Sequence, residues 1–185
     1  MLIVESTAIP AVKIFTPKKF GDHRGFFSET WNRNAFTDVG LELDFVQDNH
    51  SLSRQVGTLR GLHFQSQPLA QDKLVRVTRG RILDVALDIR ATSPSFGKYV
   101  AVELSAVNWK QLLVPVGFAH GFVTLEPDTE VLYKVTAPYA PQHDRGIAFD
   151  DPDLGIDWSL PVSDLILSDK DRKHPRFAEM QRYFD

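Results

Sequence analysis

The stretch LVRVTRGRILDVALDI, residues 74–89, alternates apolar and polar residues on both sides of Arg79-Gly80. A period of two is typical of a β-strand, and a central glycine is typical of a turn, so the stretch predicts a β-hairpin. Its second half separates two faces: Leu83, Val85, Leu87 and Ile89 against Asp84, Ala86 and Asp88. Four further runs repeat the pattern: YVAVEL (99–104), QLLVPV (111–116), HGFVTL (120–125) and TEVLYKVT (129–136).

Strand signals at intervals of roughly 8–12 residues predict an antiparallel sandwich or barrel. A parallel sheet would need long amphipathic helices between its strands, and the middle of the chain has no such pattern. Helical spacing is confined to the flanks: residues 28–39, which Gly40 would end, and the tail 168–184, where Phe177, Met180 and Phe184 would share one face. We therefore predict a β-dominated chain, a single cupin-like jelly-roll domain over residues 1–185 with short flanking helices and a helical tail from about residue 168.

Composition excludes several classes of protein. The 185 residues carry 21 Lys and Arg against 24 Asp and Glu, a net charge of −3, so no overall basic field favours nucleic acid. The absence of cysteine excludes disulfides and thiolate catalysis. No apolar run is long enough for a transmembrane helix, and the N-terminus lacks the pattern of a secretion signal. We expect a cytoplasmic protein that binds neither nucleic acid nor membranes.

The stretch TLRGLHFQ, residues 58–65, has the character of a strand but contains Arg60 and His63 beside Gly61. A single histidine in an apolar stretch is more often a hydrogen-bonded core residue than a catalytic one. Strict alternation would also point Arg60 and His63 to opposite faces of the strand. A β-bulge at Gly61 would bring both side chains to one face, and bulges are frequent beside active sites. We therefore predict a bulge at Gly61.

A second histidine motif raises the question of a metal. PVGFAHGF, residues 115–122, places His120 in the P-x-G-x-x-H pattern that metal-binding cupins show at one ligand position. Such cupins also need a paired H-x-H, because an open metal site requires three or four converging ligands. His63 is followed by Phe64 and Gln65 instead, and none of the six histidines are spaced i, i+2 or i, i+4. The ligand count favours a site without a metal.

Four side chains would suit proton transfer if the barrel brought them together: His63, Lys73, His120 and Tyr133. An imidazole with an unperturbed pKa of about 6.5 suits proton abstraction near neutral pH. A lysine can stabilise an oxyanion, and a tyrosine hydroxyl can return a proton from another direction. The set therefore suits enolisation beside a carbonyl. Taken singly, Lys73 is more readily explained as a solvated turn residue and Tyr133 as a core residue, and spacing does not show that they converge.

Nine motifs in consistent order are characteristic of one family. They are FGDHRGFFSE (20–29), FVQDNHS (45–51), LRGLHFQ (59–65), KLVRVTRG (73–80), DVALDIR (84–90), SPSFGKY (93–99), PVGFAHGFVTL (115–125), YKVT (133–136) and LSDKD (167–171). Each is moderately specific alone, but their ordered combination is highly specific. From Ile9 to about Asp171, the chain resembles the dTDP-4-dehydrorhamnose 3,5-epimerases, metal-free cupin-like enzymes of dTDP-L-rhamnose synthesis.

The resemblance implies a role for each matching residue. His63 would be the catalytic base, oriented by Asp171, and Tyr133 would protonate the opposite face of the sugar. Lys73 would stabilise the enolate oxygen at carbon 4. The remaining positions would bind the rest of the substrate: Arg60 and His120 near the pyrophosphate-linked end of the sugar, Phe20 and Tyr139 beside the thymine, and Arg24, Glu29, Gln47, Asn49, Asp144 and Lys170 around the nucleotide. Neither a metal nor a cofactor is implied.

The resemblance also implies a homodimer. The N-terminal segment of about residues 1–50 would complete the nucleotide pocket of the partner, which places Arg24 and Glu29 in the site of the other chain. One departure from the family pattern is Asp144, where the family often has Glu, so this loop would bind the nucleotide differently. The tail after Asp171 also varies, and we assign it no catalytic role.

The predicted function is epimerisation at carbons 3 and 5 of dTDP-4-dehydro-6-deoxy-D-glucose to give dTDP-4-dehydro-L-rhamnose. Three alternatives stay open. A relative in an antibiotic-sugar pathway would invert one carbon only, with the same base, lysine and tyrosine. A metal-dependent cupin oxygenase would bind a divalent ion. A non-catalytic jelly roll would bind a nucleotide sugar or carbohydrate without exchanging its protons.

Overall fold

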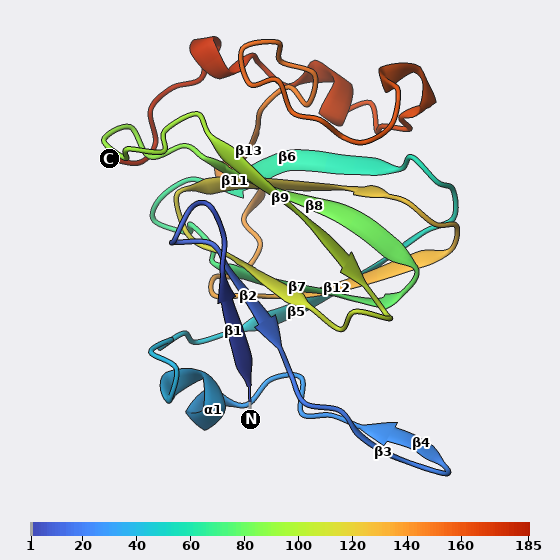
Figure 1. Cartoon of the computed structure of the whole chain (residues 1–185). Helices are drawn as coiled ribbons and strands as arrows, with labels where there is room; N and C mark the ends of the chain where they lie inside the picture. Colours follow the sequence, from blue (N-terminus) through green and yellow to red (C-terminus); the bar gives the residue numbers. More distant parts are fainter. Residues whose placement is uncertain (1) are drawn as a thin grey trace.

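The computed structural model describes residues 2–185, and all its strands except one small hairpin form two antiparallel sheets that face each other (Figure 1). The larger sheet has the order β1-β2-β10-β7-β12-β5 and the smaller sheet the order β13-β6-β11-β8-β9. Their bounds are β1 Ile3–Ser6, β2 Lys13–Thr16, β5 Gln47–Ser53, β6 Leu59–Gln65, β7 Lys73–Arg79, β8 Arg81–Asp88, β9 Tyr99–Ser105, β10 Gln111–Val114, β11 Phe118–Thr124, β12 Thr129–Val135 and β13 Asp144–Gly146. The predicted β-dominated jelly roll is confirmed.

The hairpin predicted for residues 74–89 is wrong. β7 lies in the larger sheet between β10 and β12, whereas β8 lies in the smaller sheet between β11 and β9. Gly80, with a φ of 77°, turns the chain from one sheet to the other, and a Cβ at this position would lie 2.2 Å from Oγ1 of Thr129. Alternation shows only which side chains of a strand share a face. The same alternation is found whether the turn joins two strands of one sheet or crosses from one sheet to the other, so it does not distinguish the two cases.

The main core lies between the sheets, where Ile82 and Ala86 of β8 pack against residues of the larger sheet such as Val75. The other face of β8 is buried as well, because the C-terminal segment covers the outside of the smaller sheet (Figure 1). Val85 and the other outward side chains of β8 join this second cluster, which includes Trp158. The inward positions of β8 therefore place the Asp84 carboxylate deep in the interior.

Helices are few and short. Among residues 2–185 the only α-helix is α1 (Arg33–Thr37), which is shorter than the predicted stretch 28–39. Asn32 caps its N-terminus by accepting a hydrogen bond from the backbone N–H of Ala35 at 3.2 Å, and Gly40 follows with a φ of 81°. Its buried Phe36 packs on Phe15. No helix of the described chain is long and apolar enough to cross a membrane.

The C-terminal tail is not the single helix that the sequence spacing predicted. It contains two turns of 3-10 helix, η3 (Asp171–Lys173) and η4 (Phe177–Glu179), beyond the earlier turns η1 (Pro141–His143) and η2 (Val162–Asp164). Pro175 separates η3 from η4: it lacks an N–H, and it keeps the preceding His174 extended, with a ψ of 144°. Phe177 and the other apolar side chains of the tail pack on the outer face of the smaller sheet instead.

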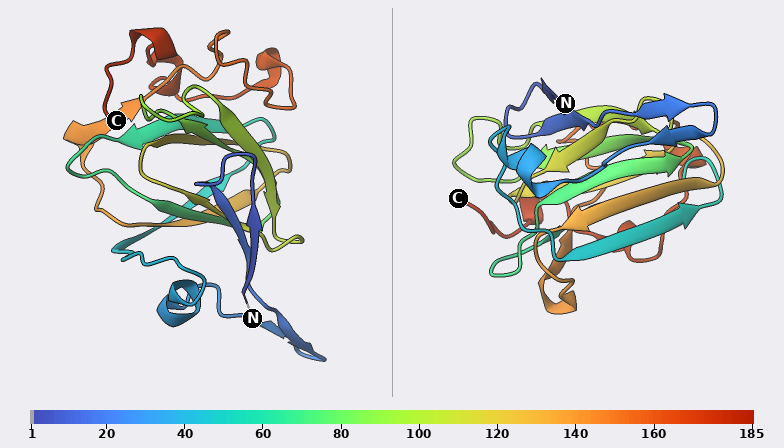
Figure 2. Two further views of the ribbon diagram at one scale, coloured as in Figure 1. Left: turned by 60° about the vertical axis from the view of Figure 1, so that its left-hand side comes forward. Right: turned by 90° about the horizontal axis from the view of Figure 1, so that it is seen from below.

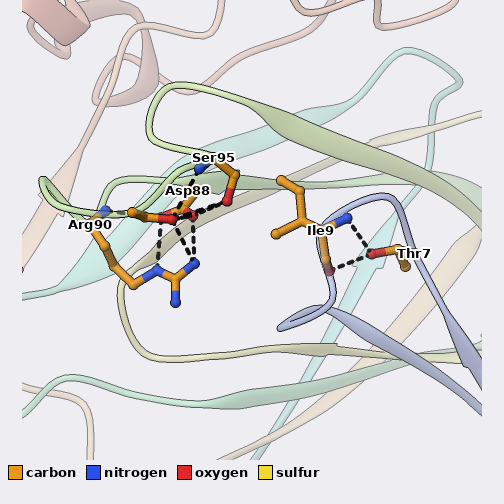
Figure 3. Close-up of polar contacts among 6 residues, drawn as sticks. Thr7, Ile9, Asp88, Arg90 and Ser95 are labelled. Atoms are coloured by element: carbon orange, nitrogen blue, oxygen red, sulfur yellow. Dashed lines mark hydrogen bonds and ion pairs between the residues drawn. The ribbon is translucent and has the colours of Figure 1, made fainter.

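A buried carboxylate anchors the turn that follows β8 (Figure 3). Asp88 accepts hydrogen bonds from the backbone and guanidinium of Arg90 and from the hydroxyls of Ser93 and Ser95, at 2.5–3.0 Å. Burial tends to raise the pKa of Asp88, but these hydrogen bonds outweigh it and lower the pKa to about 2. The SPSFGKY motif therefore supports the fold, because two of its serines hold the chain between β8 and β9.

A separate hairpin of β3 (Phe20–Asp22) and β4 (Gly25–Phe27) projects away from the two sheets (Figures 1 and 2). It lies at the end of the molecule opposite the C-terminal segment (Figure 1). Its Phe26 and Phe27 are 57% and 67% exposed. Neighbouring exposed aromatic side chains on a projecting hairpin are typical of an interaction surface.

Candidate active site

The predicted irregularity at Gly61 is present. In the pairing of β6 with β11, His63 is opposite His120 and Arg60 is opposite Phe122, so β6 has one more residue than β11 over this interval. Gly61 has a φ of 134°, and a Cβ there would lie 2.5 Å from Cα of Gly121. Only glycine fits this close approach of two backbones. The extra residue lets Arg60 and His63 line the same cavity.

This cavity lies at one end of the space between the sheets and has a volume of about 270 Å³. A neighbouring hollow of about 280 Å³ shares three of its lining residues: His63, Lys73 and Tyr133. Together the two hollows are lined by eleven residues that the sequence singled out: Gln47, Asn49, Arg60, His63, Lys73, His120, Tyr133, Tyr139, Asp144, Lys170 and Asp171. They come from both sheets and from the C-terminal segment.

His63 and Asp171 form a hydrogen-bonded pair. Nε2 of His63 lies 2.5 Å from Oδ1 of Asp171, which η3 holds almost fully buried. Burial lowers the pKa of His63, and contact with Asp171 offsets part of this effect. Burial alone would raise the pKa of Asp171, but His174 and His63 outweigh it and hold the pKa well below its usual range. At neutral pH the pair is therefore an ionised carboxylate that receives Nε2–H of a neutral imidazole, which leaves Nδ1 free to accept a proton.

Lys73 and Tyr133 supply a cation and a hydroxyl. Lys73 is buried at the start of β7, not solvated in a turn, and its Nζ donates to the backbone carbonyl of His63 at 3.3 Å. Burial lowers its pKa to about 8, which leaves the ammonium mostly charged at neutral pH. Burial raises the pKa of Tyr133, with a smaller opposing effect from Arg60, so its hydroxyl stays protonated. The two side chains thus offer a positive charge and a proton beside the imidazole.

A second histidine–carboxylate pair lies deeper in the barrel. Nε2 of His120 lies 2.6 Å from Oδ1 of Asp84, and both residues are buried. The sequence pattern puts Asp84 on the more polar face of its strand, and no role was predicted for it. An acidic residue at an inward position of a strand was the available signal, since such a buried carboxylate needs a partner. Asp84 fixes the ring of His120 at the cavity wall.

The residues assigned to the nucleotide form a hydrogen-bonded rim. Oε1 of Gln47 accepts from the backbone N–H of Tyr139 at 3.0 Å, and Nε2 of Gln47 donates to Oδ1 of Asn49 at 2.8 Å. The Tyr139 hydroxyl donates to Oδ2 of Asp144 at 3.0 Å, and Lys170 pairs with the same oxygen. Asp144 therefore ties strand β13 to the C-terminal segment at the mouth of the cavity.

Three predicted binding residues lie elsewhere. Phe20 and Arg24 belong to the projecting hairpin, where the Arg24 guanidinium pairs with Asp22 in an exposed position. Glu29 lines a separate hollow of about 120 Å³ together with Phe20. Within one chain, none of the three lines the cavity around His63.

His174 brings a second imidazole ring to the His63–Asp171 pair, and it was not predicted because the tail was expected to be a helix. Ligand atoms of His63, Asp171 and His174 lie within 4.8 Å of one another, close enough to meet at one metal ion. However, Lys73 and Arg60 line the same cavity, and their positive charges oppose a divalent cation. The cluster therefore suits proton transfer better than metal binding, and the absence of a metal cofactor stays a prediction.

Comparison with known proteins places this geometry in a family. The family model described as dTDP-4-dehydrorhamnose 3,5-epimerase matches residues 6–179. The dTDP-4-dehydrorhamnose 3,5-epimerase of Sinorhizobium fredii is 54% identical over 180 residues, which cover 95% of this chain and 90% of the relative. The enzyme of the same name from Escherichia coli is 52% identical over 168 residues, 90% of each chain.

Solved structures agree with the sequence comparison. The dTDP-4-dehydrorhamnose 3,5-epimerase of Bacillus anthracis, with TDP and PPi bound, has a TM-score of 0.92 and 47% identity over 95% of this chain and 99% of that one. The Legionella pneumophila enzyme in complex with dTDP-4-keto-L-rhamnose has a TM-score of 0.93 and 42% identity over 98% and 95%. A 3'-monoepimerase from Streptomyces bikiniensis, in complex with dTDP-quinovose, has a TM-score of 0.86 and 31% identity over 94% and 87%. Sequence and fold agree over almost the whole chain, which therefore belongs to the dTDP-4-dehydrorhamnose 3,5-epimerase family.

Proposed function

We propose that this enzyme epimerises carbons 3 and 5 of dTDP-4-dehydro-6-deoxy-D-glucose and so forms dTDP-4-dehydro-L-rhamnose. The main support is the convergence of the His63–Asp171 pair, the Lys73 ammonium and the Tyr133 hydroxyl on one cavity. Both carbons flank the ketone at carbon 4, so one enolisation apparatus serves each carbon in turn. Relatives with about half of their residues identical to this chain carry the name of this reaction.

Each epimerisation begins at a C–H bond beside the ketone. His63 takes the proton on Nδ1, and the bonding electrons pass into an enolate whose oxygen is stabilised by the Lys73 ammonium. Tyr133 then donates its hydroxyl proton to the opposite face of the same carbon, and the ketone re-forms. Before the second carbon reacts, His63 gives its proton to solvent and Tyr133 regains one.

The charged groups of the cavity suit the dTDP portion of the substrate. Arg60 and Lys170 add two cations to the wall around Lys73, and such a cluster binds a diphosphate even in a protein of net charge −3. Gln47 and Asn49 offer amide groups at the rim, and the ring of Tyr139, 57% exposed, offers a surface on which a base can stack. These assignments follow the roles that the resemblance implied.

We further propose a homodimer in which each N-terminal segment completes the nucleotide pocket of the partner. The support is the position of Arg24, Phe20 and Glu29, which lie outside the cavity of their own chain although they match the family motif. The projecting hairpin carries the exposed Phe26 and Phe27, which a partner would cover. The cytoplasmic location expected from the sequence stays a prediction that cell fractionation would test.

Mixed dimers test the shared pocket. Arg24→Ala and His63→Asn homodimers should each lose most activity, because every pocket lacks one group. After subunit exchange about half of the dimers contain both variants, and one pocket of each carries no substitution, so about a quarter of all pockets are intact. Recovery of about a quarter of wild-type turnover supports the shared pocket. Heterodimers without recovered turnover would show that Arg24 and His63 act in the same chain.

The reaction itself is tested by an NMR time course in D₂O with dTDP-4-dehydro-6-deoxyglucose and metal-stripped protein. We expect deuterium at both carbon 3 and carbon 5, with formation of the L-rhamno product. Absence of exchange at both carbons in folded protein would contradict the proposal and favour a binding protein. Activity that returned only with added metal would favour the metal-dependent alternative.

One alternative keeps specific support. The similarity to a 3'-monoepimerase, at a TM-score of 0.86, shows that this fold and a related sequence occur in an enzyme named for inversion at one carbon. Deuterium at carbon 3 alone, or at carbon 5 alone, would assign this chain to that class. The same time course therefore separates the two.

A further inference from the structure

His174 contacts the His63–Asp171 pair but has no part in the proposed mechanism. Its side chain is 10% exposed, and its Nε2 lies 3.4 Å from Oδ1 of Asp171, the same oxygen that bonds His63. The rings of His63 and His174 are nearly perpendicular, with centroids 5.4 Å apart. Two imidazoles therefore approach one carboxylate oxygen.

The backbone of β13 fixes this arrangement. Gly146 is opposite His63 in the pairing of β13 with β6, and a Cβ on Gly146 would lie 2.3 Å from atoms of the His174 ring. The carbonyl of Pro175 accepts a hydrogen bond from the backbone N–H of Ala148 at 2.8 Å. The ring is thus packed against the backbone of Gly146, where a Cβ would force it to shift, directly beside His63.

The surroundings of His174 also select its tautomer. Its Nε2 is buried and makes no well-formed hydrogen bond to residues 2–185, and buried polar atoms nearly always have a partner. A lone pair on Nε2 would be repelled by the facing carboxylate of Asp171, whereas an N–H is attracted to it. His174 therefore carries a proton on Nε2, and Asp171 divides its negative charge between two N–H groups.

We propose that His174 is a positioning residue that acts through Asp171 and limits how strongly this carboxylate holds His63. Without His174, the carboxylate would serve His63 alone, and the imidazolium form of His63 would be favoured. The positive charge of a protonated His174 acts in the same direction, since it lowers the pKa of His63. His174 would thus keep the base neutral, and ready to accept a proton, at lower pH than the pair alone would.

Other charged groups surround the rings of His63 and His174, but none of those in the described part of the chain contacts Oδ1 of Asp171. Among the Lys, Arg and His side chains of residues 2–185, only His63 and His174 approach a carboxylate oxygen of Asp171 within 4 Å. The groups that face His63 are Arg60 of β6, Lys73 of β7, His120 of β11, Tyr133 of β12 and Asp144 of β13, and those around His174 are Arg145 of β13 and Lys170, Lys173, Glu179 and Tyr183 of the tail.

The test replaces His174 with phenylalanine, which keeps a ring but has no N–H, and with glutamine, which keeps a donor. Lys173→Gln is the matched control. Lys173 lines the same surface hollow between β13 and the tail as His174, but it is exposed and forms no ion pair with Asp171. The His63 ring is titrated by NMR in free protein, and kcat/KM is measured against pH. In His174→Phe we expect the pKa of His63 and the acid limb of kcat/KM to rise by about half a pH unit or more. His174→Gln should return both toward wild type, and Lys173→Gln should leave both unchanged.

Equal His63 titration curves in wild type and His174→Phe would overturn the proposal, as would an equal shift in the Lys173→Gln control. If the phenylalanine variant fails to fold, His174→Leu provides the same loss of an N–H in a smaller side chain. The kinetic readout rests on the proposed function, whereas the NMR titration needs no substrate. A protein that shifts as expected but lacks activity would therefore contradict the function and keep the role of His174.

Discussion

Asp171→Asn tests the proposed catalytic pair of His63 and Asp171, because it removes the charge at nearly constant size. Oδ1 of Asp171 lies 2.5 Å from Nε2 of His63 in a buried position. If the amide NH₂ of asparagine takes this place, Nε2 must accept a hydrogen bond. The ring proton then moves to Nδ1, the nitrogen that has to act as the base.

The expected loss follows from these two effects. A positioned acid–base group contributes about 10²–10⁴-fold to rate, and an asparagine in the corresponding place of a protease triad costs about 10⁴-fold. We therefore expect kcat to fall by about 10²–10⁴-fold. Since Asp171 raises the pKa of His63, its removal should also move the acid limb of kcat/KM to lower pH. The pKa of Asp171 is held well below its usual range, so the wild-type charge persists across neutral pH.

The assay is the rate of deuterium entry at carbons 3 and 5, followed by NMR between about pH 5 and pH 9. Asp169→Asn is the control, because this exposed residue lies in the same turn and does not line the cavity. It should keep wild-type turnover. An Asp171→Asn enzyme with kcat within about tenfold of wild type and an unchanged acid limb would refute the assignment of the base and its partner.

Lys73→Met should lower kcat about 100-fold or more at pH 7. Because burial lowers the pKa of Lys73 to about 8, wild-type turnover should also fall above that pH as the ammonium loses its proton. Full turnover of the variant, or a wild-type pH profile without this alkaline decrease, would contradict the role of Lys73. Gly61→Ala should cost about 2–4 kcal/mol in urea unfolding, since its Cβ would lie 2.5 Å from Gly121. Gly25→Ala, at a similar φ in open space, isolates backbone strain and should cost less. Asp88→Asn should cost about 1–3 kcal/mol at pH 7. The folded pKa of Asp88, about 2, lies below its ordinary value of 3.8, so its contribution is present above pH 4 and lost as pH falls toward 2. Equal destabilisation at pH 7 and pH 2.5 would contradict this linkage.

The strand pattern predicted the architecture but not the path of the chain through it. Alternation identified the strands and divided the side chains of β8 between two faces. It did not show that the face carrying Asp84 and Asp88 is buried as well, because that burial depends on the opposite sheet. It could not distinguish a turn within a sheet from the crossing at Gly80, which depends on contacts with Thr129. In the tail, apolar residues spaced three and four apart were mistaken for a helix, whereas Pro175 stops the helix and the side chains pack in a different way.

The site was less accessible from local patterns. His63, Lys73 and Tyr133 come from strands of both sheets, and only the resemblance implied that they meet. The bulge at Gly61 was predictable, since Arg60 and His63 can share one face of a strand only where an extra residue interrupts the alternation, and glycine is the residue that a bulge accepts most easily. His174 could not be found, because its place beside Asp171 depends on how the tail crosses β13.

The pairing of His63 with Asp171 joins residues 108 positions apart in sequence. During synthesis, both sheets can be complete while the segment that carries the carboxylate is still inside the ribosome. A nascent chain at that stage lacks both the carboxylate that pairs with His63 and the apolar side chains that cover the outside of the smaller sheet. Proteolytic removal of the tail would take away the Asp171 carboxylate and also uncover the apolar outer face of the smaller sheet, so turnover and the stability of the barrel should fall together.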